Sequence, residues 1–199
     1  MPDRPNEKYT IRRQVFKLFG AAFHVYGSQG ELVAYCKQKA FKLREDIRLF
    51  TDESCSEELF VLSARSILDF STTYDVTLSD GTSLGSLRRK GMKSSFIRDH
   101  WLVFDPAGQE IASIQERGSF MSFLRRVHDA AALLSPQTFD VARTSDGKQI
   151  ASFRQHFNPF VFRLGVAVLD KDEHIDELVI LAAACLIAAI VELVRRAHC

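Results

Sequence analysis

The sequence of 199 residues lacks the patterns by which many functions are recognised. Positive and negative charges nearly cancel, with 26 Lys and Arg against 25 Asp and Glu and a net charge of +1. Because there is no overall positive charge, nothing in the composition favours a nucleic-acid partner, and we expect none. The six histidines occur without HxH, HExxH or Cys/His spacing, so we expect neither a metal site nor a cofactor.

The cysteines and the first residues give an expectation about the compartment. The four cysteines lie far apart and form no CxxC pair, which is typical of free thiols in a reducing cytosol. The opening sequence MPDRPNEKYT has no apolar stretch of the kind that a secretory signal contains. We therefore expect a cytoplasmic protein, either free or peripheral at a membrane. A short disordered tail at 1–9 is expected before a single domain at 10–199.

Motifs for catalysis are missing as well. The GSQG sequence at Gly27–Gly30 lacks the GxSxG spacing of a nucleophile elbow. No glycine-rich loop leads from a predicted strand into a helix, as nucleotide binding requires. We assign no catalytic residues and expect a protein that is not an enzyme.

What the sequence does contain is one hairpin motif of seventeen or eighteen residues that occurs four times. Each copy has an aromatic residue and a Val in its first arm, a Gly at the turn, and then an apolar–small–Tyr/Ser–apolar run that ends in charge. Repetition of this kind indicates an architecture built from one supersecondary unit. The copies are Phe23–Lys39, Tyr74–Lys90, Trp101–Arg117 and Phe139–His156.

The spacing of these hairpins predicts a mainly β protein. The pairs Asp80-Gly81 and Asp146-Gly147 suit tight hairpin turns. A fifth, degenerate hairpin is predicted between Ile47 and Ala64, and single strands are predicted at 10–18 and 160–169. Together these elements give about twelve strands. Apolar residues at helical spacing predict an amphipathic helix over 119–134 as well.

The last helix predicted is apolar on every face. It covers Leu178–Val191, with the sequence LVILAAACLIAAIV, and must be buried either in lipid or in protein. As a helix this run is about 21 Å long, which is shorter than the ~30 Å hydrocarbon core of a bilayer. Its many Ala residues make it slender enough for the inside of a barrel of this size. We therefore favour a buried core helix over a membrane span, with the acids of 170–177 at the positive end of its dipole.

Four such hairpins followed by an all-apolar C-terminal helix resemble the tubby C-terminal-like superfamily, and within it the phospholipid scramblase and LURP-one-related branch. The resemblance covers roughly Lys17 to Arg195. It implies a closed twelve-stranded antiparallel barrel threaded by its C-terminal helix. It also implies association with membrane lipids, since tubby domains bind phosphoinositides and scramblases are membrane-associated. The Cys-rich, Pro-rich and calcium-binding segments of scramblases have no counterpart in this sequence.

One basic segment is the candidate site for an anionic ligand. Its cations would converge on phosphates, while nearby apolar residues would enter the membrane interface; alternatively, the segment is a solvated strand end. The function then remains open between a barrel that binds anionic phospholipid headgroups, a protein-interaction or regulatory scaffold with no lipid role, and a tail-anchored membrane protein. The candidate residues are Arg88, Arg89, Lys90, Lys93 and Arg98, which Arg12, Arg13, Lys17, Arg125 and Arg126 would enlarge if the fold brings them close.

Overall fold

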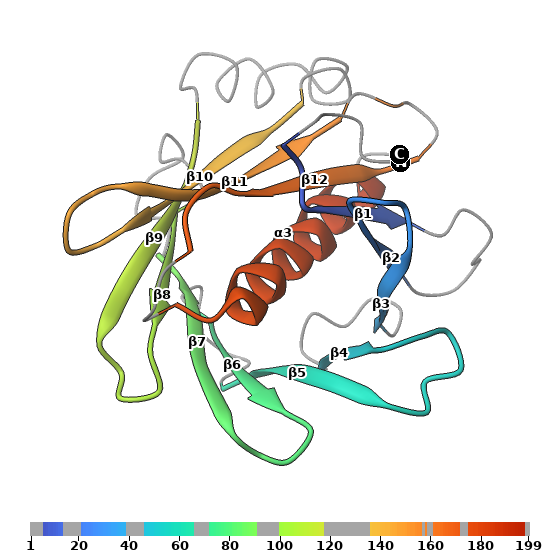
Figure 1. Cartoon of the computed structure of the whole chain (residues 1–199), viewed down its shortest axis with the longest axis horizontal. Helices are drawn as coiled ribbons and strands as arrows, with labels where there is room; N and C mark the ends of the chain where they lie inside the picture. Colours follow the sequence, from blue (N-terminus) through green and yellow to red (C-terminus); the bar gives the residue numbers. More distant parts are fainter. Residues whose placement is uncertain are drawn as a thin grey trace.

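The protein is a closed antiparallel barrel of twelve strands with one long helix inside it (Figure 1). The computed structural model describes residues 6–13, 21–38, 46–65, 72–90, 100–117, 136–156, 158, 161–171 and 175–197. The helix predicted at 119–134 lies outside the described residues. The predicted fold class and strand number are confirmed.

Each strand pairs with its neighbours in the sequence, and the first strand (Tyr9–Arg13) pairs with the last (Arg163–Val168) to close the barrel. The fifth hairpin predicted from the sequence is formed by β4 and β5. The strands are β1 (Tyr9–Arg13), β2 (Ala21–Gly27), β3 (Leu32–Gln38), β4 (Ile47–Phe50), β5 (Glu58–Ala64), β6 (Thr73–Leu78), β7 (Ser83–Arg89), β8 (His100–Phe104), β9 (Glu110–Glu116), β10 (Thr138–Arg143), β11 (Gln149–Gln155) and β12 (Arg163–Val168), and the helix is α3 (Glu177–Ala197).

The repeated hairpin motif contains a structural irregularity that the sequence alone did not reveal. In every copy the first-arm Val pairs with the small residue of the second arm, and the apolar residue just before that small residue has no partner in the register. This is a β-bulge, which bends a strand and increases its twist, as closing a barrel requires. The unpaired residues are Val33, Leu84, Ile111 and Ile150, with Leu59 in the same place in the fifth hairpin.

The turns of the hairpins also share a hydrogen-bonding pattern. In three copies the N–H of the turn glycine donates to the carbonyl three residues earlier, as in Gly81 to Leu78 at 3.0 Å, and the glycine has a positive φ. The fourth copy is one residue longer, and there Gly147 donates to Arg143. In the fifth hairpin Cys55 takes this position with a φ of 56°. A non-glycine residue adopts such a conformation only at some cost.

The small residues of the repeat make room for α3. Every residue of α3 from Val179 to Ile190 is buried, and most of the central ones are Ala or Cys. The helix comes closest to β7 and β12. On β7 the small residue beside the bulge, which pairs with Val76, is Gly85. Of the two alternatives for the apolar C-terminal run, the structure shows the buried core helix.

The start of α3 is tied to β1 by polar contacts. Asp176 caps the helix, its Oδ1 accepting from the N–H of Leu178 at 2.8 Å. Glu177 accepts from Lys8 Nζ at 2.6 Å and from the Tyr9 hydroxyl. Burial alone would raise the pKa of Glu177, but the hydrogen bonds from Lys8 and Tyr9 outweigh it and the pKa is lowered. These two acids lie at the positive end of the helix dipole, as the sequence predicted.

The chain just before β1 packs on the outer face of the barrel. Residues 6–9 belong to the expected tail and are described in the structure. Glu7 is only 7% exposed, and its carboxylate lies 2.8 Å from Nε2 of His156. It lies over Gly165 of β12, where a Cβ would come within 2.2 Å of the Glu7 carboxyl group. A glycine at this position therefore lets the acid reach its histidine partner.

Candidate binding surfaces at the two ends of the barrel

The two ends of the barrel differ in how the strands are joined. At the end we call the turn end, short turns close the four repeated hairpins, a seven-residue loop joins β4 to β5, and β12 leads into α3. At the opposite end, the link end, the hairpins are joined to one another and to β1 and β12. Because neighbouring strands are antiparallel, the second arm of each copy of the repeat ends at the link end. The acids before the turn glycine in three copies, Asp80, Asp105 and Asp146, lie at the turn end.

Exposed cations gather at the link end. Strands β1, β7 and β11 run toward this end, and each has a basic residue among its last two. In the part of the chain that the structure describes, four exposed cations of these strand ends take part in no ion pair. They are Arg12, Arg88, Lys90 and Arg154.

Acids near the link end are already neutralised or buried. Asp75 accepts three hydrogen bonds from the Arg65 guanidinium, the shortest at 2.6 Å. Asp140 holds Arg117 in the same bidentate way, at 2.7 Å for both bonds. Both carboxylates follow the aromatic residue of their hairpin, at a position where the other two copies have His24 and Leu102. Glu116 is only 5% exposed. The exposed charge of the described link end is therefore positive.

The predicted site residues do not form one cluster. Arg88 lies outside the barrel, its guanidinium 4.6 Å from the ring centre of Phe104. Arg89 is half-buried on the inner face, 5.8 Å from the ring centre of Trp101, because successive residues of a strand point to opposite faces. Lys90 is exposed. The remaining residues of the prediction, Lys93, Arg98, Lys17, Arg125 and Arg126, lie outside the described residues.

The basic residues of β1 lie on the other side of the barrel from Arg88. In the closed strand order, β1 and β7 are six strands apart in either direction. Arg12 and Arg13 therefore share an end with the basic segment of β7 but no lateral face. Sequence reasoning missed Arg154, which lies on β11, next but one to β1. The charged ending common to all copies of the repeat was the signal that could have identified it.

The turn end is acidic. Asp52, Asp80 and Asp105 each accept a backbone N–H of their own turn, at 2.7 to 2.8 Å. Hydrogen bonds from Ser54 and Thr82 lower the pKa values of Asp52 and Asp80, so these carboxylates are charged at neutral pH. Three cations of this end are paired with acids, in Lys8–Glu177, Arg143–Asp170 and Lys148–Asp170.

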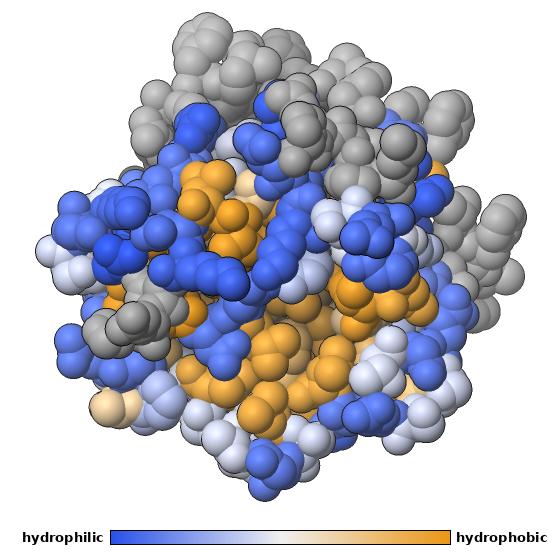
Figure 2. Space-filling model, viewed as in Figure 1, coloured by the Kyte–Doolittle hydropathy of each residue, from blue (hydrophilic) through white to orange (hydrophobic). Residues whose placement is uncertain are grey.

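Half-buried leucines lie among these acids. Figure 2 shows apolar residues within a hydrophilic border, over the region where β5, β6, β7 and α3 lie in Figure 1. The leucines come from the bulges, from the end of β6 and from the first turn of α3. We call this set the apolar rim: Leu59, Leu78, Leu84 and Leu178.

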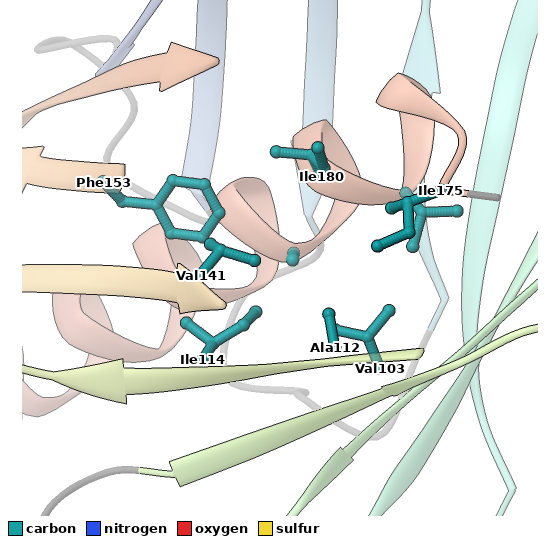
Figure 3. A pocket seen from close by; sticks show the side chains of 9 residues that line it. Val103, Ala112, Ile114, Val141, Phe153, Ile175 and Ile180 are labelled. Carbon is teal, nitrogen blue, oxygen red and sulfur yellow. The ribbon is translucent and has the colours of Figure 1, made fainter. Parts of the chain in front are cut away.

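A small void lies in the interior that the structure describes. One void of about 10 Å³ lies between α3 and strands β8 to β11, beside Ile175, Ile180 and Phe153 (Figure 3). A single water needs about this much room and polar partners, whereas this void is lined by apolar side chains. Among the described residues, no group of three His, Cys, Asp or Glu side chains is placed to hold a metal ion, and no helix is long and apolar enough to cross a membrane.

Comparison with known proteins places the chain in a family. The model of the LURP-one-related family matches residues 33–188, which is most of the barrel and α3. The chain belongs to the LURP-one-related family, as its repeats and C-terminal helix predicted. An X-ray structure of a protein from Arabidopsis thaliana is similar, with 15% sequence identity, a TM-score of 0.49, and coverage of 94% of this chain and 93% of that chain. No curated protein matches the sequence.

Proposed function

We propose that the protein is a non-catalytic binding module whose link end docks on a membrane surface rich in anionic phospholipid. The observation that carries this proposal is the difference in charge between the two ends. The described link end exposes four cations that form no ion pair within the described residues, Arg12, Arg88, Lys90 and Arg154. A cation close to an anionic membrane contributes about 1 kcal/mol.

The arrangement favours a flat, multivalent surface over a single small anion. Arg12 and Arg88 come from strands on opposite sides of the barrel, so one headgroup cannot reach both. A membrane presents many headgroups in one plane and can engage cations around the whole end. The acidic turn end would then face away from the membrane.

Binding to vesicles tests this function. Sedimentation with phosphatidylcholine vesicles that contain phosphatidylserine or a phosphoinositide should bring the protein down, and the bound fraction should fall as salt increases. The double variant Arg88→Ala/Lys90→Ala should weaken binding by roughly tenfold or more, at about 1 kcal/mol per lost cation. Its melting temperature should barely change, because exposed charges contribute little to stability.

The matched control removes two cations from the opposite end. Lys148→Ala/Lys171→Ala changes the net charge equally but leaves the link end intact, so this variant should bind vesicles like the wild type. Equal losses for both double variants would mean that net charge alone attracts the protein. Wild-type protein that ignores anionic vesicles at low salt would end the lipid proposal and favour the scaffold function.

A further inference from the structure

The apolar rim at the turn end is placed where a partner could cover it. Its leucines come from four neighbouring elements: Leu59 from β5, Leu78 from β6, Leu84 from β7 and Leu178 from α3. All four pack against the core and remain half-buried. Apolar side chains gathered in this way, with polar residues around them, are typical of an interaction surface.

The border of the apolar rim determines which partner fits. The β4–β5 turn, next to Leu59, carries Asp52 and Glu57, and the β6–β7 turn, which joins Leu78 to Leu84, carries Asp80. All three are exposed, and within the described residues none of them forms an ion pair. Because hydrogen bonds inside the turns keep Asp52 and Asp80 charged, a partner would meet negative charge in the two turns beside the leucines.

We propose that the turn end is a docking surface for a cationic amphipathic segment of a partner protein. Apolar side chains of the segment would cover the apolar rim, and Lys or Arg on its flanks would lie against the turn carboxylates. Apolar contact would supply the affinity, while charge complementarity would speed association and exclude acidic segments. This inference concerns the end opposite the proposed lipid surface and does not depend on it.

A synthetic peptide is the probe for this surface. We would use a helical peptide of about eighteen residues with leucines on one face and lysines on the other, labelled for fluorescence anisotropy. At about 0.15 M salt, where charges are screened beyond roughly 8 Å, it should bind the wild type. A peptide with glutamate in place of every lysine should not bind.

Two pairs of variants test where the peptide binds. Leu84→Ser should weaken binding by roughly tenfold or more, as loss of a central apolar contact does, whereas Leu169→Ser, at a leucine that is 52% exposed elsewhere on this end, should bind normally. Asp52→Asn/Asp80→Asn keeps the acceptors of both turns but removes two charges, and should weaken binding roughly three- to tenfold. The control Asp105→Asn/Asp146→Asn removes two charges from two other turns. It should change the free energy of binding by less than about half as much as Asp52→Asn/Asp80→Asn does. Circular dichroism would confirm that all four variants are folded.

Several outcomes would overturn this proposal. They are failure of the lysine peptide to bind, equal binding of the glutamate peptide, and equal losses for both members of either pair.

A dimer that forms with increasing concentration and is lost in Leu84→Ser would assign the apolar rim to a second copy of this chain. Binding to neutral phosphatidylcholine vesicles that is lost in the same variant would assign it to a membrane. Loss of anionic-vesicle binding in Arg88→Ala/Lys90→Ala with unchanged peptide binding would show that the two ends act separately.

Discussion

Replacing Gly85 by alanine should lower the free energy of unfolding by more than about 3 kcal/mol, since two costs combine at this position. Gly85 has a φ of 133°, which residues with a Cβ rarely adopt. A Cβ would also lie 2.2 Å from the carbonyl oxygen of Phe104 on β8. Because this oxygen belongs to the backbone, the sheet itself would have to move. Chemical denaturation monitored by circular dichroism would measure the loss.

A matched control separates the two costs. Gly81 also has a positive φ, of 89°, but a Cβ there would meet nothing within 4 Å. Gly81→Ala should therefore cost only about 1–2 kcal/mol, the penalty for the left-handed conformation alone. The other copies of the repeat have Ala34, Ala112 and Ala151 at the position of Gly85. If Gly85→Ala were as stable as the wild type, the bulge on β7 would be placed wrongly.

Deleting residues 175–199 should abolish cooperative unfolding. Removing α3 takes away a continuous stretch of buried side chains, from Val179 to Ile190. The inner faces of all twelve strands would then surround an empty apolar space, which neither water nor a collapsed sheet can fill well. The truncated chain should bind a hydrophobic dye and lose its dispersed NMR signals, as a molten chain does.

Addition of the missing helix controls for a general effect of truncation. A synthetic peptide of residues 175–197, added while the truncated chain refolds from denaturant, should restore dispersed NMR signals if the helix acts as the core. A truncated chain that unfolds cooperatively without any peptide would show that the barrel has a core of its own, contrary to the packing around α3.

The fold could be predicted from the sequence because local and global signals agree in this chain. Repeated turn glycines, alternating strands and a slender apolar helix each point to the same closed barrel. The bulges were not predicted, although the residues that form them were visible as the apolar–small pair of each repeat. Register is set by pairing across strands, and the unpaired role of Ile111 or Leu84 appears only once the pairing is known.

The candidate site could be predicted only in part, because it too depends on how the strand residues are oriented and paired. Arg88 and Arg89 looked like one basic cluster, yet they are successive strand residues and lie on opposite faces of β7. The period of two in a strand was sufficient to separate them. The difference in charge between the two ends could not be predicted from this alternation. Only the closed antiparallel strand order brings the charged endings of β1, β7 and β11 to one end of the barrel.

The orientation of the protein on a membrane is the most direct test of the proposed function. Gln109 and Gln115 are exposed residues at opposite ends of the hairpin formed by β8 and β9, at the turn end and the link end respectively. Each would be changed to cysteine and spin-labelled, in a background where Cys55 and Cys199 are replaced by serine. On vesicles containing phosphatidylserine, paramagnetic relaxation measurements should place the label at position 115 close to the headgroups and the label at 109 in water. Labels equally far from the bilayer, or the label at 109 closer to it, would contradict the account.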